Sequence, residues 1–225
     1  MANVLGMDEL NIAQTYSPTN KPMPYRQYFG EMDLDEDEIE ERIAMARRLE
    51  DDAFKWVFGA IALASMLGTL DSEQFYVDSL YERYRDVVED FGYGVENGYQ
   101  RVDDYIYSAS GVIIGNTFKR ITNGVITNTY FTSDDRAMFC AEEETNSVEE
   151  CAGFVNAVIS GKRTKQWSAI IDKRTREHHR DYSGTAVPIT EPFEILGELM
   201  MFPRDLSLGA SSDNVTNCRC HAIYR

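Results

Sequence analysis

The chain has 225 residues, of which 43% are hydrophobic, so it is long enough to bury a core in one large domain or two small ones. Its net charge of -16 is unevenly spread, because residues 1–160 carry 12 Lys and Arg against 30 Asp and Glu, whereas residues 161–225 carry 10 against 8. The acidic part would repel a DNA backbone, which disfavours general DNA binding by that part.

The N-terminus lacks the basic and apolar segments of a secretory signal, and the most apolar stretch, residues 56–68, is too short to span a bilayer. We therefore expect that the chain does not associate with a membrane. We expect it to be synthesised in a bacterial-type cytoplasm, where its four cysteines are initially reduced.

Residues 1–36 are predicted to form an extended acidic arm. Proline and polar residues dominate its first part, and eight carboxylates follow within residues 31–41. We interpret the acidic run as the solvated first turns of a helix, whose dipole favours negative charge there. An acidic docking patch is the alternative.

Residues 37–160 are predicted to form a helical domain, because apolar residues recur at intervals of three and four. The expected helices are 37–70, 72–91, a third around 102–113 and 136–159. The segment 116–130, with Asn123-Gly124, could be either a helix or a hairpin. Cys140 and Cys151 are expected on one apolar face of the last helix, packed in the core.

Residues 161–225 differ from the preceding part in composition and residue pattern, and they are predicted to form a small α+β module. Strand-like segments at 167–171, 186–189 and 193–196 are separated by glycine and proline. The whole chain is therefore expected to be α+β, with a mainly helical N-terminal part and this module at its C-terminal end.

The module contains an ordered set of polar and aromatic residues. It reads Trp167-x4-Asp172-x-Arg174-Thr175-Arg176-x2-His179-x4-Gly184, then Phe193, Phe202-Pro203-x-Asp205 and Asn217-Cys218-Arg219-Cys220. The preceding helix adds Arg136-Ala137 and Ala141-Glu142-x-Glu144-Thr145-Asn146. In this order and spacing, the set resembles the core of the phage Mu F-like head morphogenesis family, also called minor head or minor capsid proteins, over roughly residues 133–225.

The resemblance implies a structural protein of a phage head, without catalysis. It would act in head assembly near the portal and in genome packaging or delivery, with a portal, capsid or scaffold protein as partner. Its place would be the virion, and the host cytoplasm during assembly. Longer members carry additional C-terminal material, in some cases a toxin-like enzyme; because this chain stops five residues after Cys220, we expect such an activity to be absent.

The chemistry of the motif residues favours a structural role. Trp167 can anchor a small core, Gly184 suits a tight turn, and Asp172 can cap a turn or pair with Arg176. Arg174 and Arg176 can bind carboxylates, phosphates or carbonyls. We predict that Asp172, Arg174, Arg176 and His179 form one buried polar network that holds a poorly cored module together.

His179, Cys218 and Cys220 also permit a metal hypothesis. Two thiolates and an imidazole, with His178 or His221 as fourth ligand, would form a zinc site. The favoured alternative requires no cofactor and places both cysteines on one face of a terminal strand as small apolar groups. A disulfide between them would be strained.

Two further alternatives involve activity or DNA. Cys218 or Cys220 with His179 could form a nucleophile–base pair in an enzyme, a hydrolase or a transferase, packaged in the head. Arg174, Arg176, Arg180 and Arg219 could make a zinc-stapled module that contacts packaged DNA. The sequence lacks a glycine-rich phosphate loop and a nucleophile elbow, which disfavours the enzyme.

Overall fold

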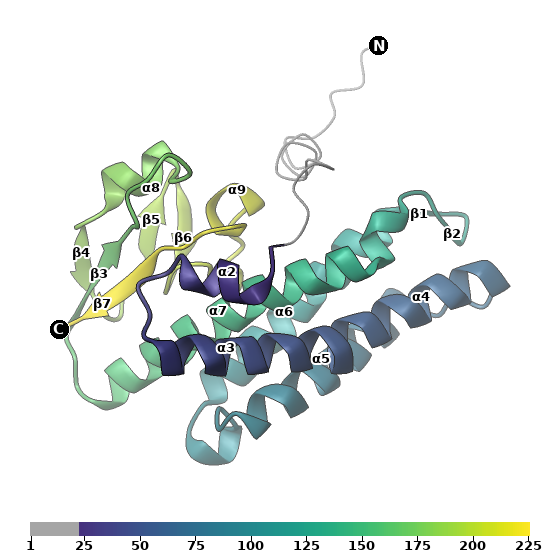
Figure 1. Ribbon diagram of the computed structural model, residues 1–225, viewed down its shortest axis with the longest axis horizontal. Helices are drawn as coiled ribbons and strands as arrows, with labels where there is room; N and C mark the ends of the chain where they lie inside the picture. Colours follow the sequence, from purple (N-terminus) through teal and green to yellow (C-terminus); the bar gives the residue numbers. More distant parts are fainter. Residues whose placement is uncertain (1–22) are drawn as a thin grey trace, which may run out of the picture. The chain divides into compact units, whose positions relative to one another are not determined.

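The computed structural model describes residues 23–225, which form two compact units (Figure 1). The described residues up to Ala152 make up the first, here called the helical unit, and Gly153–Arg225 make up the C-terminal unit. Helices dominate, and the short antiparallel strands concentrate in the C-terminal unit, so the predicted α+β class is confirmed. Among the described residues, no helix is both long and apolar enough to cross a bilayer.

The helical unit consists of helices and one short hairpin. Its elements are α2 (Tyr25–Gly30), α3 (Glu36–Arg48), the π-helical turn η1 (Leu49–Phe54), α4 (Lys55–Leu67), α5 (Glu73–Asp90), η2 (Val95–Asn97), α6 (Gln100–Phe118), β1 (Ile121–Thr122), β2 (Val125–Ile126), η3 (Thr129–Thr132) and most of α7 (Asp134–Ile159).

The first predicted long helix is present as α3, η1 and α4, which run on continuously (Figure 1). Asp35 begins it with a capping box, accepting from the backbone N–H of Glu38 while the Glu38 side chain accepts from the N–H of Asp35. Gly68 ends it in the left-handed conformation. The acidic run thus supplies the cap and first turn of α3, as the helix interpretation expected.

The predicted extended arm is wrong for residues 25–30. These residues form α2, whose Tyr25, Tyr28 and Phe29 are buried and which packs on α3. Aromatic burial outweighs the turn chemistry of the neighbouring prolines here. The rest of the predicted arm up to residue 22 lies outside the described residues. The undecided segment 116–130 is resolved as the end of α6 and a hairpin that turns at Asn123-Gly124.

The α7 helix carries an unusually polar stretch in the core of the helical unit. Glu142 to Ser147 are all buried, although four of these six side chains are Glu or Asn. Tyrosine hydroxyls serve two of the carboxyls: Tyr28 donates to Glu143 at 2.8 Å, and Tyr84 and Tyr105 donate to Glu144 at 3.0 and 2.9 Å. Burial of the Glu143 and Glu144 carboxyls is tolerated because they accept these hydrogen bonds.

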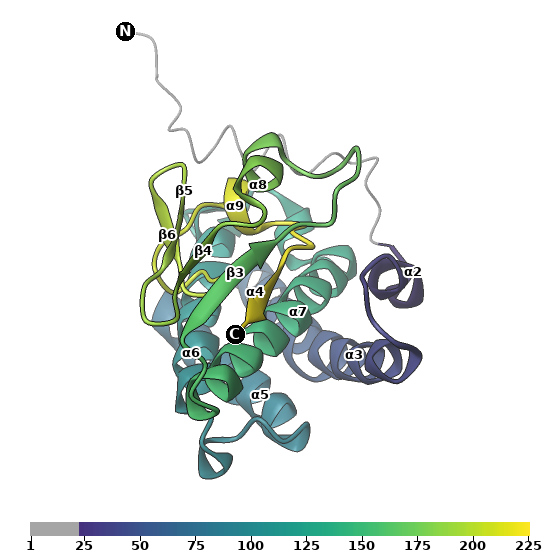
Figure 2. The ribbon, with the colours of Figure 1, turned by 90° about the vertical axis from the view of Figure 1, so that its left-hand side faces the viewer.

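The C-terminal unit is built on small antiparallel sheets (Figure 2). Its elements are β3 (Thr164–Ser168), α8 (Glu177–Tyr182), β4 (Ala186–Pro188), β5 (Phe193–Ile195), β6 (Glu198–Met200), α9 (Ser212–Val215) and β7 (His221–Tyr224), besides the end of α7. The strand order is β4-β3-β7, with Trp167 opposite Ala222, and β5 and β6 form a separate hairpin.

The core of this unit surrounds Trp167, which is fully buried with Phe193, Met200, Cys218 and Cys220. The strand predicted at 167–171 is shifted towards the N-terminus and spans Thr164–Ser168 as β3, with Lys165 and Trp167 as its buried residues. The Lys165 ammonium donates to Met201 O at 2.6 Å. The strand predictions at 186–189 and 193–196 are confirmed as β4 and β5.

Candidate functional site

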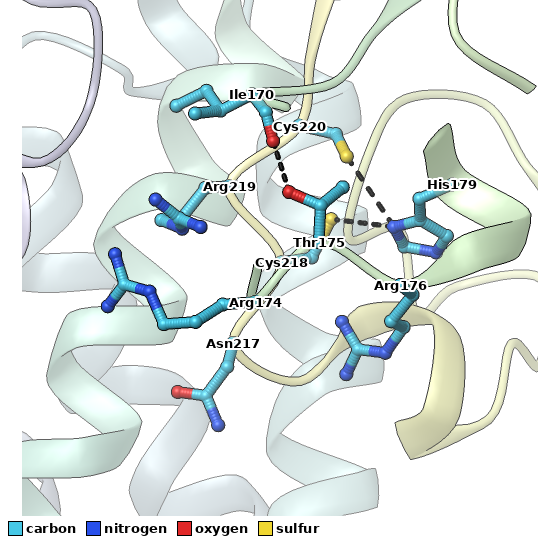
Figure 3. A pocket seen from close by; sticks show the side chains of 9 residues that line it. All are labelled: Ile170, Arg174, Thr175, Arg176, His179, Asn217, Cys218, Arg219 and Cys220. Carbon is cyan, nitrogen blue, oxygen red and sulfur yellow. Dashed lines mark hydrogen bonds between the residues drawn. The ribbon is translucent and has the colours of Figure 1, made fainter. Parts of the chain in front are cut away.

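The motif residues meet at a small pocket in the C-terminal unit (Figure 3). The turn after β3 contributes the residues around Arg174, α8 contributes His179, and the segment between α9 and β7 contributes the residues around Cys218. The pocket is lined by Ile170, Arg174, Thr175, Arg176, His179, Asn217, Cys218, Arg219 and Cys220. The pocket has room for roughly one water molecule.

His179 is the centre of the site. Its imidazole is 1% exposed, and its Nδ1 lies 3.5 Å from the sulfur of Cys218 and 3.5 Å from the sulfur of Cys220. Figure 3 shows both sulfurs directed at this one nitrogen. The three potential ligand atoms lie within 4.8 Å of one another, and all three residues are buried. They could hold a metal ion.

Asn214 fixes the tautomer of His179. The Asn214 amide donates to Ile195 O at 3.3 Å and to a carboxyl oxygen of Glu198 at 2.6 Å, which assigns its nitrogen and leaves its oxygen as acceptor. That oxygen lies 3.2 Å from His179 Nε2, so Nε2 carries the proton. In a neutral ring, Nδ1 therefore presents its lone pair to the two sulfurs.

The two cysteines shift each other's pKa in opposite directions. The hydrogen bond from the Cys220 thiol lowers the pKa of Cys218 well below its usual value, and His179 and Arg204 add to this effect against the opposing effect of burial. The pKa of Cys220 is raised, because it shares its proton with Cys218 and is itself buried. Arg204, 2% exposed, also donates to Cys218 O and thereby holds the backbone of the pair.

Asp172 organises the turn between β3 and α8. Its carboxylate accepts from the backbone N–H of Arg174 at 2.8 Å and of Thr175 at 3.1 Å, and it pairs with Arg219 at 2.7 Å. The hydrogen bond from Arg219 is the main reason that the pKa of Asp172 is lowered. The Thr175 hydroxyl donates to Ile170 O and closes the turn.

The four residues Asp172, Arg174, Arg176 and His179 do not form the single buried polar network that was predicted. Asp172 pairs with Arg219, and Arg176 donates to Thr216 O. His179 belongs to the separate set with Asn214 and the cysteines. Arg174 does form an ion pair with Asp172 at 3.6 Å, but the Arg174 side chain is 51% exposed, so this part of the predicted network lies at the rim and is not buried.

The other predicted residues have structural placements. Trp167 is the core anchor, and its ring packs edge-on against His179 with centroids 5.3 Å apart. Gly184 has a φ of 90°, which glycine adopts without strain, and Pro203 is buried. Asn217 has a φ of 53°, a region that asparagine tolerates better than most residues.

Two expectations about the cysteines are corrected. Cys218 and Cys220 precede β7, which begins at His221, so they do not lie on a terminal strand. Neither His178 nor His221 belongs to the group of ligand atoms around Nδ1 among the residues that the structure describes.

Sequence reasoning missed Asn214, Glu198 and Arg204. Their roles depend on contacts between residues 14 to 35 positions apart in the chain, and no local spacing indicates them. The only available signal was the position of Asn214 and Arg204 in the same C-terminal stretch as the Cys-Arg-Cys motif.

Comparison with known proteins gives the family. The model of the family described as Phage Mu protein F like protein matches residues 105–223, which include most of α6, all of α7 and the entire pocket. The NAD(+)–arginine ADP-ribosyltransferase EFV of Enterococcus faecalis is 39% identical over 80 residues, which are 35% of this chain and 16% of that protein. No solved structure matches. With more than half of its length matched, the chain belongs to the phage Mu F-like family of head-morphogenesis proteins.

Proposed function

We propose that the chain is a minor head protein of a phage particle, a structural component that acts in head assembly near the portal and in packaging or delivery of the genome. The observation that carries this proposal is the family match over residues 105–223. The virion would be its final location, reached from the host cytoplasm during assembly.

The contacts of the motif residues support a structural role. Arg176 and Arg204 bind backbone carbonyls of the C-terminal unit, and Arg219 binds Asp172. These cations therefore stabilise the unit's own loops. Contact with packaged DNA would fall to Arg174 and Arg180, which are exposed.

The helical unit offers a surface for a portal, capsid or scaffold protein. We call this surface the apolar tip. It consists of three side chains of α4, Leu63 (57% exposed), Met66 (84%) and Leu67 (66%), and of Val125 in the hairpin (61%). Ser65 ties the hairpin to α4, donating to Gly124 O at 2.7 Å and accepting from Ile126 N–H at 3.2 Å. Contiguous exposed apolar groups commonly mark protein contacts.

The test uses the full chain co-produced with the portal and capsid proteins of the same phage. We expect it to purify with assembled heads and with the portal protein. Met66→Asp with Leu67→Asp should remove this association, and Leu196→Asp, a residue of the C-terminal unit that is 72% exposed, should retain it. Purified particles that lack the chain would overturn the proposal; association unaffected by the tip variant would place the contact elsewhere on the chain.

The match to the transferase favours one alternative, ADP-ribosyl transfer to arginine. The aligned segment is a small part of that protein, so the activity named there applies to a much longer chain. Incubation of the full chain with NAD(+) and an arginine-rich acceptor, followed by mass measurement, separates the two candidates. We expect no transfer; a mass gain of one ADP-ribosyl group on the acceptor would favour the enzyme.

A further inference from the structure

We propose that Cys218, Cys220 and Nδ1 of His179 bind a tetrahedral divalent metal ion of the zinc type, with the fourth position open to a water molecule in the pocket. This inference is independent of the partner of the head protein. It assigns the cluster to metal binding and to the stability of the C-terminal unit.

The ligand spacing fits such an ion. With Zn–N distances of about 2.0–2.1 Å and Zn–S distances of about 2.3 Å, the nitrogen and a sulfur at two corners of a tetrahedron lie about 3.5 Å apart. Both sulfurs lie 3.5 Å from Nδ1. Nδ1 and the two sulfurs lie within 4.8 Å of one another and all three residues are buried, as the ligands of one shared ion would be.

The surroundings of His179 match those of a metal ligand. A ligating histidine normally donates its other ring N–H to a fixed acceptor, which orients the ring and selects the tautomer. Asn214 fills this role, since its oxygen faces Nε2 and its amide nitrogen is held by Glu198 and Ile195 O. Asn214 itself is 1% exposed, so the orientation is fixed by buried contacts.

The open position is defined by the pocket. Three protein ligands leave one corner of the tetrahedron, and the pocket that borders all three has room for roughly one water molecule. Neither His178 nor His221 joins the group among the described residues, so the fourth ligand is expected from solvent. Thiol groups that are protonated in the metal-free chain release their protons to solvent on binding.

The ion would join distant parts of a small unit. His179 lies on α8, and the cysteines lie about 40 residues later, between α9 and β7. A cross-link of this kind stabilises a domain whose core is small, because the metal binds the folded unit and not the unfolded chain. The metal therefore has a structural role that requires no reaction.

The first experiment measures metal content. The full chain, purified without chelator, is analysed for metals by mass spectrometry, and we expect about one zinc per chain. Cys218→Ser, Cys220→Ser and His179→Gln should lose it. Cys140→Ser and Cys151→Ser are matched controls, since these cysteines are also buried but lie on α7, and they should retain it.

A second measurement applies if the site variants do not fold. Metal-free wild-type chain is titrated with cobalt(II) alone, and we expect the absorption of a tetrahedral ion together with a thiolate-to-cobalt charge-transfer band. Asn214→Ala, which leaves all three ligands in place, should weaken cobalt binding about 10- to 100-fold. A folded wild-type chain without zinc and without this spectrum would overturn the proposal, as would zinc bound equally by the site variants.

Discussion

Asp172 and Arg219, which are 47 residues apart in the chain, form an ion pair at 2.7 Å that joins the turn before α8 to the segment before β7. The same carboxylate caps the turn by accepting two backbone N–H groups. One side chain therefore holds the two chain segments that border the pocket.

Replacing this carboxylate should destabilise the C-terminal unit. Because the pKa of Asp172 is lowered in the folded chain, its contribution is present above the unfolded value of about 3.9 and is lost as the pH falls through the folded value. Asp172→Asn should therefore unfold at lower denaturant concentration near neutral pH, and the gap to the wild type should narrow below about pH 3.

Asp181→Asn, at an exposed position of α8, serves as the control and should match the wild type at both pH values. A fully stable Asp172→Asn variant would mean that the carboxylate is not structural and would point to a functional role.

Trp167→Ala should be among the most damaging single substitutions. The side chain is fully buried at the centre of the small core, and truncating such a residue costs about 3–5 kcal/mol. Trp56 provides the comparison, since it is 49% exposed and stacks under the Arg83 guanidinium at 3.4 Å; Trp56→Ala should cost about 1 kcal/mol or less. Denaturant unfolding of the two variants checks this, and equal losses would contradict it.

Glu142 should make the helical unit less stable at high pH. Burial raises its pKa to about 9, with Glu143 and Glu50 adding to the shift. Because this value lies above the unfolded value of about 4.3, the stabilising form is the protonated one, whose contribution is full below about pH 4 and is lost as the pH rises through about 9.

Glu142→Gln keeps the neutral shape and should raise the melting temperature by a few degrees near pH 9, where 1 kcal/mol corresponds to about 2–4 °C for a chain of this size. At about pH 5 the two proteins should have similar melting temperatures. Glu82→Gln, exposed on α5, is the control and should show no such pH dependence. A constant difference between Glu142→Gln and wild type across pH would refute the assignment.

The sequence predicted the features that follow from local periodicity and turn chemistry. Apolar spacing located α3 to α7, and Asn123-Gly124 was compatible with the hairpin that forms. It did not predict α2, where burial of Tyr28 and Phe29 decides the structure, nor the inward orientation of Lys165 in β3. Both depend on tertiary contacts that override local propensity.

The candidate site was predicted in the same partial way. The motif order identified His179, Cys218 and Cys220, and the structure brings these three together. Of the two roles considered for Asp172, the turn cap is present, whereas the structure pairs its carboxylate with Arg219 and not with Arg176. Contacts such as His179 with Asn214 join residues 35 positions apart, and sequence spacing holds no information about them.

The two tyrosine hydroxyls that donate to Glu144 should contribute to stability in an energetically coupled way. Tyr84 and Tyr105 both donate to Glu144 Oε2, at 3.0 and 2.9 Å, and all three side chains are buried. Tyr84→Phe or Tyr105→Phe should each cost about 1 kcal/mol, because the second hydroxyl still serves the same oxygen.

The double variant removes both donors from a buried oxygen, so it should cost more than the sum of the single changes, by about 0.5–3 kcal/mol. Denaturant unfolding of the four proteins in the cycle measures this excess. Tyr81→Phe is the control, since its hydroxyl donates to Asp103 at 2.9 Å in a partly exposed place, and it should not couple to Tyr105→Phe. Strict additivity of the Tyr84 and Tyr105 changes would show that Glu144 does not depend on this shared arrangement.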